Sequence, residues 1–599
     1  MNWKIILFWL FIFSGLTFSF FSYASFLFDA QEEMQLFILQ WSVIKLQLST
    51  PGGTCRILGL LCTQFYCFPL IASIINSCLL TSIGIGCYLL FQRITKRGYH
   101  LFLSLIPVFI LLKAHIQSNY VIDGTIGILC LLLVLLGVLS FHSWKIRLAA
   151  NIAGILFIFW TCGPLVLLYA ILSIAFELIP FNSTIQTDSV SVRLFSGIVS
   201  FLLASLFIFI GIRYSLQTPL TEGLNGKAYH EMQLQSESFV YHIWIIFCTA
   251  LLFLLLISWL LCFIKWQRKS VIIILTTSII TSFFLFVWFS LPNTYDAKNR
   301  MMDQLSYLSR RQKWDVIIQI HSGQKLSNTI NRNYLNMALA QKGELGNRLF
   351  YFDQHGPNSL LTFYNGSYYM SVLLSDIHFM IGDISLSESY AMEGLTLARR
   401  GGSPRMLQRL IQISLIKQEW KLAQKYISIL KQTLTYKEWA IRHEDFIAHP
   451  ENMNEDPELK NKYFFPQEND ALFSLLNIDT IWNKHFDEKS PNRTAFEYLG
   501  CSYLLAKETE LFKQFLLKTV NHPIAKPLPL HFQEAALIAF ADNPEVLQTI
   551  SIDPSVIQKY NGYIRLANQM ANQPNGIANI YKHYGNTYWF YHQYKNTGK

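Results

Sequence analysis

The chain has 599 residues, of which 52% are apolar and only 14% are charged, whereas an ordinary soluble domain carries about 25% charged residues. The first 292 residues hold 24 Lys, Arg, Asp and Glu, and the 307 residues that follow hold 62. This composition excludes a single soluble domain, a fibrous protein and a disordered chain, and predicts a membrane domain at 1–292 followed by a water-facing domain at 293–599. The net charge of +10 is divided between the two parts, so neither has the concentrated basic patch of a nucleic-acid-binding protein.

Charge-free apolar runs in the first part are long enough for membrane helices, which need about 20 residues to cross about 30 Å of hydrocarbon. They are Ile5–Phe28, Ile57–Gln92, Gly124–Trp144, Leu148–Phe176, Leu194–Ile212, Ser238–Ile264 and Ser270–Tyr295, with a shorter run from Gly98 to Leu112. We divide the second run into a surface helix and a span that begins near Pro69, because proline bends or ends a helix. The first run is longer than the apolar core of a signal peptide, so we predict an uncleaved span. Nine of the ten cysteines lie in or beside these runs and are expected to pack as small apolar side chains.

Gly163 and Pro164 divide the run Leu148–Phe176 into two short helices. These form either one kinked crossing or a hairpin that returns to its starting side. Short cytoplasmic loops of membrane proteins collect Lys and Arg, and the hairpin places ten such residues inside and five outside, whereas a single crossing gives eight and seven. We therefore predict about nine membrane helices including the hairpin, in a multi-pass protein of the bacterial inner membrane. The loop Asp29–Arg56 and the C-terminal domain then lie on the non-cytoplasmic side, which is the periplasm if the source is a diderm bacterium.

From Met301 onward, the sequence predicts short amphipathic helices that are separated by single turn residues. Gly343, Gly382 and Gln418 each lie between two apolar helices, at intervals of 39 and 36 residues. This spacing is close to the 34 residues of tetratricopeptide repeats, so we predict an all-α, tetratricopeptide-like domain with a long polar loop at about 449–470. Arrays of helix pairs form concave surfaces, which makes a periplasmic protein or peptide the expected partner. The alternative is an array that only packs on the membrane domain.

Four acidic residues lie beside predicted spans on the outer side of the membrane. Asp29, Glu32 and Glu33 follow the first span, and Asp123 precedes the run that begins at Gly124. Carboxylates in this position suit a site in which one acts as a general base and another holds a divalent metal or polarises a leaving phosphate, so a metal cofactor is left open. The alternative for each residue is a solvated acidic loop.

Three further polar residues on the same side are candidates for binding a ligand or a lipid phosphate. Gln64 interrupts an apolar run, and Lys113 and His115 end the short span that begins at Gly98. The alternatives are a hydrogen bond from Gln64 to a neighbouring helix and a lysine that extends toward the headgroups. The second domain has no Walker loop and no HExxH, CxxC or GxSxG motif. Any chemistry is therefore expected at the outer face of the first domain.

Several segments resemble an uncharacterised family of Bacteroides-type membrane proteins. They are Gln31–Gln40 (QEEMQLFILQ), the turn Pro51–Gly53, the QFY of Gln64–Tyr66 with Pro69, and Tyr584–Tyr594 (YGNTYWFYHQY). The resemblance covers the entire chain and implies a polytopic membrane domain followed by helical repeats. It implies no activity, because the family is known only as a domain of unknown function.

The membrane domain also resembles the type-C glycosyltransferases, which take sugars from polyprenyl-phosphate donors on the outer face of a membrane. The resemblance rests on the acids after the first span, on Asp123, and on the segment AGILFIFWTCGP from Ala153 to Pro164, although Thr161 and Cys162 stand where a lysine is often found and no DxD pair is present. It implies transfer of a glycosyl group from a lipid-linked donor to a periplasmic acceptor. Asp29 or Glu33 would then act as the base, and Asp123 would support a metal or the acceptor.

The sequence therefore supports two functions of different classes. One is the glycosyltransferase, and the other is a non-catalytic scaffold that is anchored in the membrane and recruits envelope proteins through its repeats. An enzyme predicts that the carboxylates converge on an outward-facing cavity with apolar walls open to lipid, whereas a scaffold predicts that they are scattered in solvent. A transporter is disfavoured because the ionisable groups of the predicted spans lie at the ends of those spans.

Overall fold

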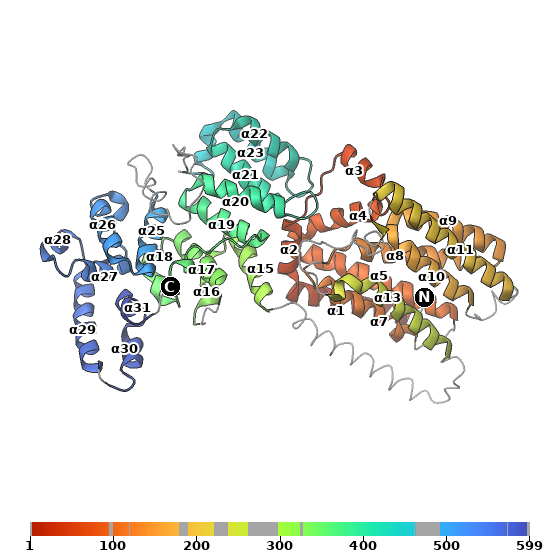
Figure 1. Ribbon diagram of the computed structural model, residues 1–599, viewed down its shortest axis with the longest axis horizontal. Coiled ribbons are helices and arrows are strands. Elements are labelled where there is room, and N and C mark those ends of the chain that lie inside the picture. The colour runs from red at the N-terminus through yellow and green to blue at the C-terminus, as the bar shows by residue number, and fades with distance from the viewer. Residues whose placement is uncertain are drawn as a thin grey trace. The chain divides into compact units, whose positions relative to one another are not determined.

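The computed structural model describes residues 3–94, 100–118, 120–178, 190–217, 219–220, 238–260, 285, 297–323, 328–460, 462, 492–571 and 573–595. Within these ranges the regular elements are all helices, and the chain divides into two compact units (Figure 1). Unit 1 comprises Met1–Arg300 together with Arg399–Gly401 and Gln432–Thr435. Unit 2 comprises Met301–Ala398, Gly402–Lys431 and Tyr436–Lys599. The two short downstream segments of unit 1 come from turns in the C-terminal part of the sequence.

The helices of unit 1 follow one another closely along the chain. They are α1 Trp3–Tyr23, α2 Ser25–Glu33, α3 Trp41–Leu48, α4 Gly53–Thr63, η1 Gln64–Cys67, α5 Pro69–Ile94, α6 His100–Leu103, α7 Leu105–His115, α8 Asp123–Val138, α9 Trp144–Cys162, η2 Gly163–Leu165, α10 Val166–Leu178, α11 Val190–Ile210, η3 Gly211–Leu216 and α13 Ser238–Leu260. As expected, α5 begins at Pro69, because proline suits the first turn of a helix, where its missing N–H group is not needed.

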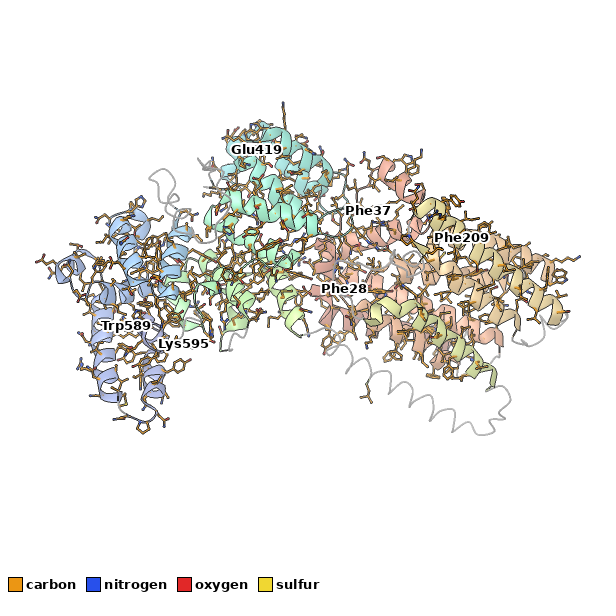
Figure 2. The ribbon with its side chains drawn as sticks, viewed as in Figure 1. Phe28, Phe37, Phe209, Glu419, Trp589 and Lys595 are labelled. Carbon is orange, nitrogen blue, oxygen red and sulfur yellow. The ribbon has the colours of Figure 1, made fainter. Side chains whose placement is uncertain are left out.

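Four helical segments of unit 1 are long and apolar enough to cross a membrane: Trp3–Tyr23, Pro69–Arg93, Trp144–Glu177 and Leu194–Ser215. Three shorter apolar helices are His100–His115, Asp123–Val138 and Ile243–Ser258. The predicted span Ser270–Tyr295 falls almost entirely outside the described residues, so the total of about nine membrane helices stays a prediction. Large apolar side chains such as Phe209, which is 49% exposed, cover the outer faces of these helices (Figure 2).

Helices α9 and α10 fold back on each other as a hairpin. Arg147 near the start of α9 pairs with Glu177 near the end of α10, with an Nε–Oε1 distance of 2.8 Å. Farther along, Asn151 donates a hydrogen bond to Ser173. The chain reverses at Gly163, which has a φ of +60° and a ψ of −127°. This backbone conformation is open to glycine and strained for other residues.

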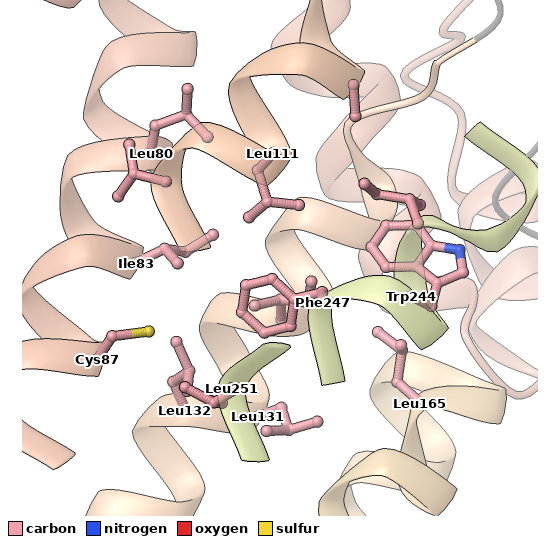
Figure 3. Close-up of a cluster of buried hydrophobic side chains, with 14 of the residues drawn as sticks. Leu80, Ile83, Cys87, Leu111, Leu131, Leu132, Leu165, Trp244, Phe247 and Leu251 are labelled. Atoms are coloured by element: carbon pink, nitrogen blue, oxygen red, sulfur yellow. The ribbon is translucent and has the colours of Figure 1, made fainter. Parts of the chain in front are cut away.

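The core of unit 1 lies between α5, α7, α8 and α13. Figure 3 shows Trp244 and Phe247 of α13 against leucines of the neighbouring helices, including Leu111 and Leu132. Glycines allow this close approach, since a Cβ on Gly124 would lie 1.9 Å from the Trp244 ring. Lipid is as apolar as these side chains, so tight packing, and not the exclusion of water, holds such helices together.

Consecutive long helices of the bundle, such as α5, α7 and α8, alternate in direction, which gives unit 1 two distinct ends. His115 at the end of α7 hydrogen-bonds Asn76 in the first turns of α5. At the other end, His100 stacks on Phe91 near the end of α5, and Ser258 near the end of α13 lies within 3.3 Å of His100. We call the first end the carboxylate end, because Asp29, Glu32, Glu33 and Asp123 lie there, and the second the opposite end, where Lys4, Arg93, Lys145 and Arg147 lie.

The helices of unit 2 are mostly short. They are α15 Ala297–Arg310, which begins in unit 1, α16 Trp314–His321, α17 Thr329–Gln341, α18 Leu345–Arg348, η6 Leu349–Tyr351, η7 Pro357–Ser359, α19 Tyr368–Ile381, α20 Ile384–Leu397, α21 Pro404–Ile416, α22 Trp420–Leu430, α23 Lys437–Ala448, η8 Pro450–Asn454, α25 Arg493–Ala506, α26 Thr509–Thr519, η10 Pro523–Ala525, α27 Leu530–Ala539, α28 Pro544–Thr549, α29 Pro554–Met570, α30 Gly576–Tyr584 and α31 Tyr588–Tyr594. The predicted loop at 449–470 contains η8, and most of its later residues lie outside the described ranges.

In the described part of unit 2, one turn recurs five times between consecutive helices. Its central residue has a positive φ and is Gln312, Gly343, Gly382, Gln418 or Lys507. In every case the N–H of the next residue bonds the carbonyl five residues earlier, as Asp383 does to His378 at 2.9 Å and Glu419 to Ser414 at 2.8 Å. This pattern is the Schellman motif, which ends a helix and satisfies its last carbonyls. The three turn residues predicted from the sequence all occupy its left-handed position.

Replacing Gln418 with glycine is expected to raise the free energy of unfolding of unit 2 by about 1 kcal/mol, because glycine avoids the steric cost of a left-handed backbone. Gln418 has a φ of +59° and an exposed side chain. Gly382→Ala at the equivalent turn, with a φ of +91°, should have the opposite effect. Urea denaturation of the full chain measures both changes in the free energy of unfolding. If both substitutions stabilised or both destabilised unit 2, the two turns would not share this geometry.

Asp376 joins two helices of unit 2 through a pair of arginines. Its carboxylate lies 2.7 Å from Arg405 and 2.9 Å from Arg409 of α21. The guanidinium of Arg409 also lies 3.8 Å above the ring of Phe379. Burial alone would raise the pKa of Asp376, but the two guanidiniums outweigh burial and hold this pKa below its ordinary value.

The contribution of Asp376 to stability should depend on pH. Because its pKa is lower in the folded chain than in the unfolded chain, its stabilising effect is complete above pH of about 4 and is lost as the pH falls through the folded value. We expect Asp376→Asn to lower the free energy of unfolding at pH 7 and to have much less effect in strong acid. Urea denaturation measures the difference in the free energy of unfolding between wild type and Asp376→Asn. An equal difference at pH 7 and in strong acid would contradict this prediction.

Candidate functional site

Three of the predicted carboxylates lie on α2, which follows α1 after a break at Ala24. Asp29, Glu32 and Glu33 are 1%, 1% and 2% exposed. They are therefore buried and do not belong to a solvated loop. Phe28, labelled in Figure 2, holds this helix by packing on Tyr66 at a ring-centroid distance of 5.0 Å. Burying a charged carboxylate costs several kcal/mol before any partner compensates it, so three on one short helix indicate a specialised environment.

The fourth predicted carboxylate, Asp123, begins α8 and forms a buried ion pair. One of its oxygens accepts a hydrogen bond from Arg400, and the two side chains are 1% and 7% exposed. The first turn of a helix also favours a negative charge, because the backbone dipoles point their positive ends there. Gly59 of α4 packs against the other oxygen, since a Cβ at Gly59 would lie 1.9 Å from Asp123 Oδ1. Asp123 is thus enclosed by α4, α8 and the segment Arg399–Gly401.

Hydrogen bonds connect the acidic helix α2 to the turn that leads into Asp123. Gln31 donates to the carbonyl of Gln117 at 3.2 Å and to that of Tyr120 at 3.5 Å. Arg399 donates to the carbonyl of Ser118, in the same turn, at 2.8 Å. Both groups of predicted carboxylates are therefore fixed by one turn, the one between α7 and α8.

A continuous polar network lies beneath this turn, among apolar helices. The two ring nitrogens of His115 lie 2.7 Å from Asn76 Oδ1 and 2.8 Å from Thr125 Oγ1. Thr125 then bonds the hydroxyl of Tyr120 at 2.6 Å, and Asn76 bonds the hydroxyl of Tyr66 at 2.8 Å. All five side chains are at most 2% exposed. Polar groups in such a position must be satisfied internally, and fully connected networks fix one arrangement of the helices.

The three predicted ligand-binding residues have different environments. His115 belongs to the buried network. Gln64 is 5% exposed, and its amide donates to the carbonyl of Phe37 at 3.2 Å, which is the structural alternative stated for this residue. Its Oε1 atom is buried and accepts no hydrogen bond from any described residue. Lys113 lies in the last turn of α7 and is partly exposed.

The most important group that sequence reasoning missed is Arg400. It lies in the RRGG segment of the C-terminal part, far along the chain from Asp123, and no local pattern connects the two. Asn76 was also missed, although it is a polar residue in a long apolar run, as Gln64 is. The same criterion applied to both residues would have found it.

A divalent metal was left open by the sequence. Among the residues that the structure describes, no group of three or more His, Cys, Asp or Glu side chains is arranged to hold a metal ion. Asp123, the residue expected to support a metal, has the guanidinium of Arg400 as its partner.

The long apolar helices indicate a membrane-associated protein, and its regular elements are helices throughout the described residues. The chain belongs to a family of unknown function (DUF6057), whose model matches residues 1–595. This confirms the predicted membership of an uncharacterised family over the whole chain. No curated protein and no solved structure matches the sequence significantly.

Proposed function

We propose that this protein is a membrane glycosyltransferase, similar to the type-C enzymes, that moves a sugar from a polyprenyl-phosphate donor to an acceptor outside the cytoplasm. The observation that carries the proposal is the burial of Asp29, Glu32, Glu33 and Asp123 at one end of an apolar bundle. The scaffold function predicts that these carboxylates lie in solvent, whereas ionisable groups inside membrane domains commonly mark functional sites. The resemblance of Ala153–Pro164 to these enzymes supports the same function.

The proposed reaction needs one base and an environment that stabilises a leaving phosphate. The acceptor hydroxyl attacks the anomeric carbon of the sugar, the bond from that carbon to the phosphate oxygen breaks, and polyprenyl phosphate leaves with the electron pair. Asp29 or Glu33 takes the proton of the hydroxyl. Asp123, positioned by Arg400, orients the acceptor. A divalent metal, if bound there, would supply positive charge to the phosphate.

Three polar residues of the carboxylate end are the proposed contacts to the donor headgroup. Gln64 offers a buried Oε1 atom to a sugar hydroxyl. Lys113, with its flexible ammonium group, suits a phosphate at the membrane surface. His115 is proposed to act by holding the network beneath the headgroup. We further propose that a cavity, open to lipid, lies beside these residues and receives the donor.

We place the carboxylate end outside the cytoplasm and the opposite end inside. Lys4, Arg93, Lys145 and Arg147 lie at the opposite end, and cytoplasmic ends of membrane proteins are enriched in Lys and Arg. In a Bacteroides-type diderm bacterium, this orientation puts the site in the periplasm and the protein in the inner membrane. The pairing of Arg400 with Asp123 supports a periplasmic location for the chain around residue 400.

Unit 2 is proposed to be a tetratricopeptide-like array that binds the periplasmic acceptor, a protein or peptide. The five Schellman turns with equivalent hydrogen bonds support a repeated helix pair. They also favour the alternative function, a scaffold that recruits envelope proteins, because such arrays commonly bind other proteins.

Isosteric substitution of the carboxylates separates the two functions. We would compare the envelope glycans of strains whose single copy carries Asp29→Asn, Glu32→Gln, Glu33→Gln or Asp123→Asn, with alanine variants alongside. Glu177→Gln is the matched control, since Glu177 is also buried, at 5% exposure, but lies at the opposite end. An enzyme predicts loss of a glycan in Asp123→Asn and in at least one α2 variant, and none in the control. Unchanged glycans in every stably expressed carboxylate variant would favour the scaffold.

A further inference from the structure

Two thiols lie side by side at the tip of the α9–α10 hairpin. Cys55 of α4 and Cys162 at the end of α9 have sulfur atoms 3.6 Å apart, and the two residues are 2% and 0% exposed. A third cysteine, Cys130 on α8, interacts electrostatically with Cys162. Cys55 and Cys162 therefore form a pair of adjacent nucleophiles. The sequence had predicted only that these cysteines pack as small apolar side chains.

The backbones on either side of the pair are already joined. The N–H of Gly52, just before α4, donates to the carbonyl of Trp160 at 3.0 Å. A disulfide needs a sulfur–sulfur distance of about 2.0 Å, so the two sulfurs, now 3.6 Å apart, must approach by about 1.6 Å. The surroundings are close-packed, since a Cβ on Gly127 would lie 3.8 Å from the Cys55 sulfur and 3.7 Å from the Cys162 Cβ.

We propose that Cys55 and Cys162 are an oxidation site that closes into a disulfide linking α4 to the hairpin tip. The sulfurs lose two protons and two electrons as the bond forms. The electrons pass to a small diazene in vitro, or, in the periplasm, to the disulfide of a thiol–disulfide oxidoreductase that acts during folding. The Thr161 hydroxyl donates to the carbonyl of Phe157 at 2.7 Å, so at 3.2 Å from the Cys162 sulfur it can accept the S–H proton of that thiol.

Cys55, and not Cys130, is proposed as the partner of Cys162, because its sulfur lies 3.6 Å from the Cys162 sulfur. Cys55 lies on α4, whose Gly59 packs on the Asp123 carboxylate. A link from the hairpin tip to α4 would therefore fix one wall around Asp123. Reaction with diazene depends only on the described geometry, so its outcome is independent of the proposed glycosyltransferase activity.

The experiment treats the full-length protein in detergent with diamide, blocks the remaining thiols with an alkylating reagent, and identifies linked peptides by mass spectrometry without reduction. The wild type is expected to yield a peptide pair joined through Cys55 and Cys162, lighter than the two free peptides by the mass of two hydrogen atoms. Cys130→Ser should give the same pair, and Cys55→Ser and Cys162→Ser should not.

Two results would overturn the proposal. One is full alkylation of Cys55 and Cys162 after diamide treatment, and the other is a Cys130–Cys162 link as the main product in the wild type. Cys78, which is exposed on α5, is the internal control for the reagents. It should be alkylated in every sample.

Discussion

Replacing Arg400 with alanine is expected to lower the free energy of unfolding of unit 1 by about 3–5 kcal/mol. The truncation leaves the Asp123 carboxylate buried without its guanidinium, and an uncompensated buried charge costs about this much. Thermal and denaturant unfolding of the full chain in detergent micelles measures the change. Adding Asp123→Asn should recover part of the loss, because the neutral amide no longer needs a cation.

Arg56 provides the matched control for this substitution. Its positive charge also acts on Asp123, but its side chain is exposed to solvent. Exposed charge pairs contribute about 1 kcal/mol or less, so Arg56→Ala should have little effect. Equal losses for Arg56→Ala and Arg400→Ala would contradict the buried ion pair and the enclosure of Asp123.

Arg147→Ala at the opposite end is also expected to lower the free energy of unfolding of unit 1 by about 3–5 kcal/mol, because it leaves Glu177 buried and unpaired. Arg147 makes two hydrogen bonds to Glu177, at 2.8 and 3.3 Å, and one to the carbonyl of His142 at 3.0 Å. These bonds close the open ends of the α9–α10 hairpin. The same unfolding measurement in micelles tests this prediction.

Two variants control for a general effect of removing charge. Lys145→Ala removes an exposed cation two residues earlier and should leave stability nearly unchanged. The double variant Arg147→Leu with Glu177→Leu should be more stable than Arg147→Ala, because apolar pairs can replace buried ion pairs at little cost. A double variant as unstable as Arg147→Ala would show that lost packing, and not the unpaired charge, causes the effect.

Local patterns predicted much of the fold. The apolar runs predicted the long helices. Pro69 predicted the start of α5, and Gly163 with Pro164 predicted the turn of the hairpin, because proline and glycine restrict or free the backbone at their own positions. The break of the first run at Ala24 was missed. No turn residue marks it, since α2 resumes directly after one non-helical residue. The short segments that join unit 1 from the C-terminal part depend on tertiary packing, which local patterns do not encode.

The candidate site was predicted only in part. The acids were chosen for their positions beside spans, and the structure places all four at the same end of unit 1. Their burial could not be predicted, because an acid at the end of an apolar run is equally compatible with solvent. The network of His115, Asn76 and Thr125 requires three helices to meet. The pairing of Asp123 with Arg400 requires a turn from a distant part of the chain.

The amount of polyprenyl-phosphate-linked sugar in membranes tests most directly whether the buried carboxylates form a catalytic site. It would be measured by mass spectrometry in cells whose only copy carries Asp123→Asn, beside wild-type and Glu177→Gln cells with equal amounts of protein. If these carboxylates are catalytic, the lipid-linked sugar accumulates in the Asp123→Asn cells alone. Equal amounts in all three strains would contradict a catalytic role.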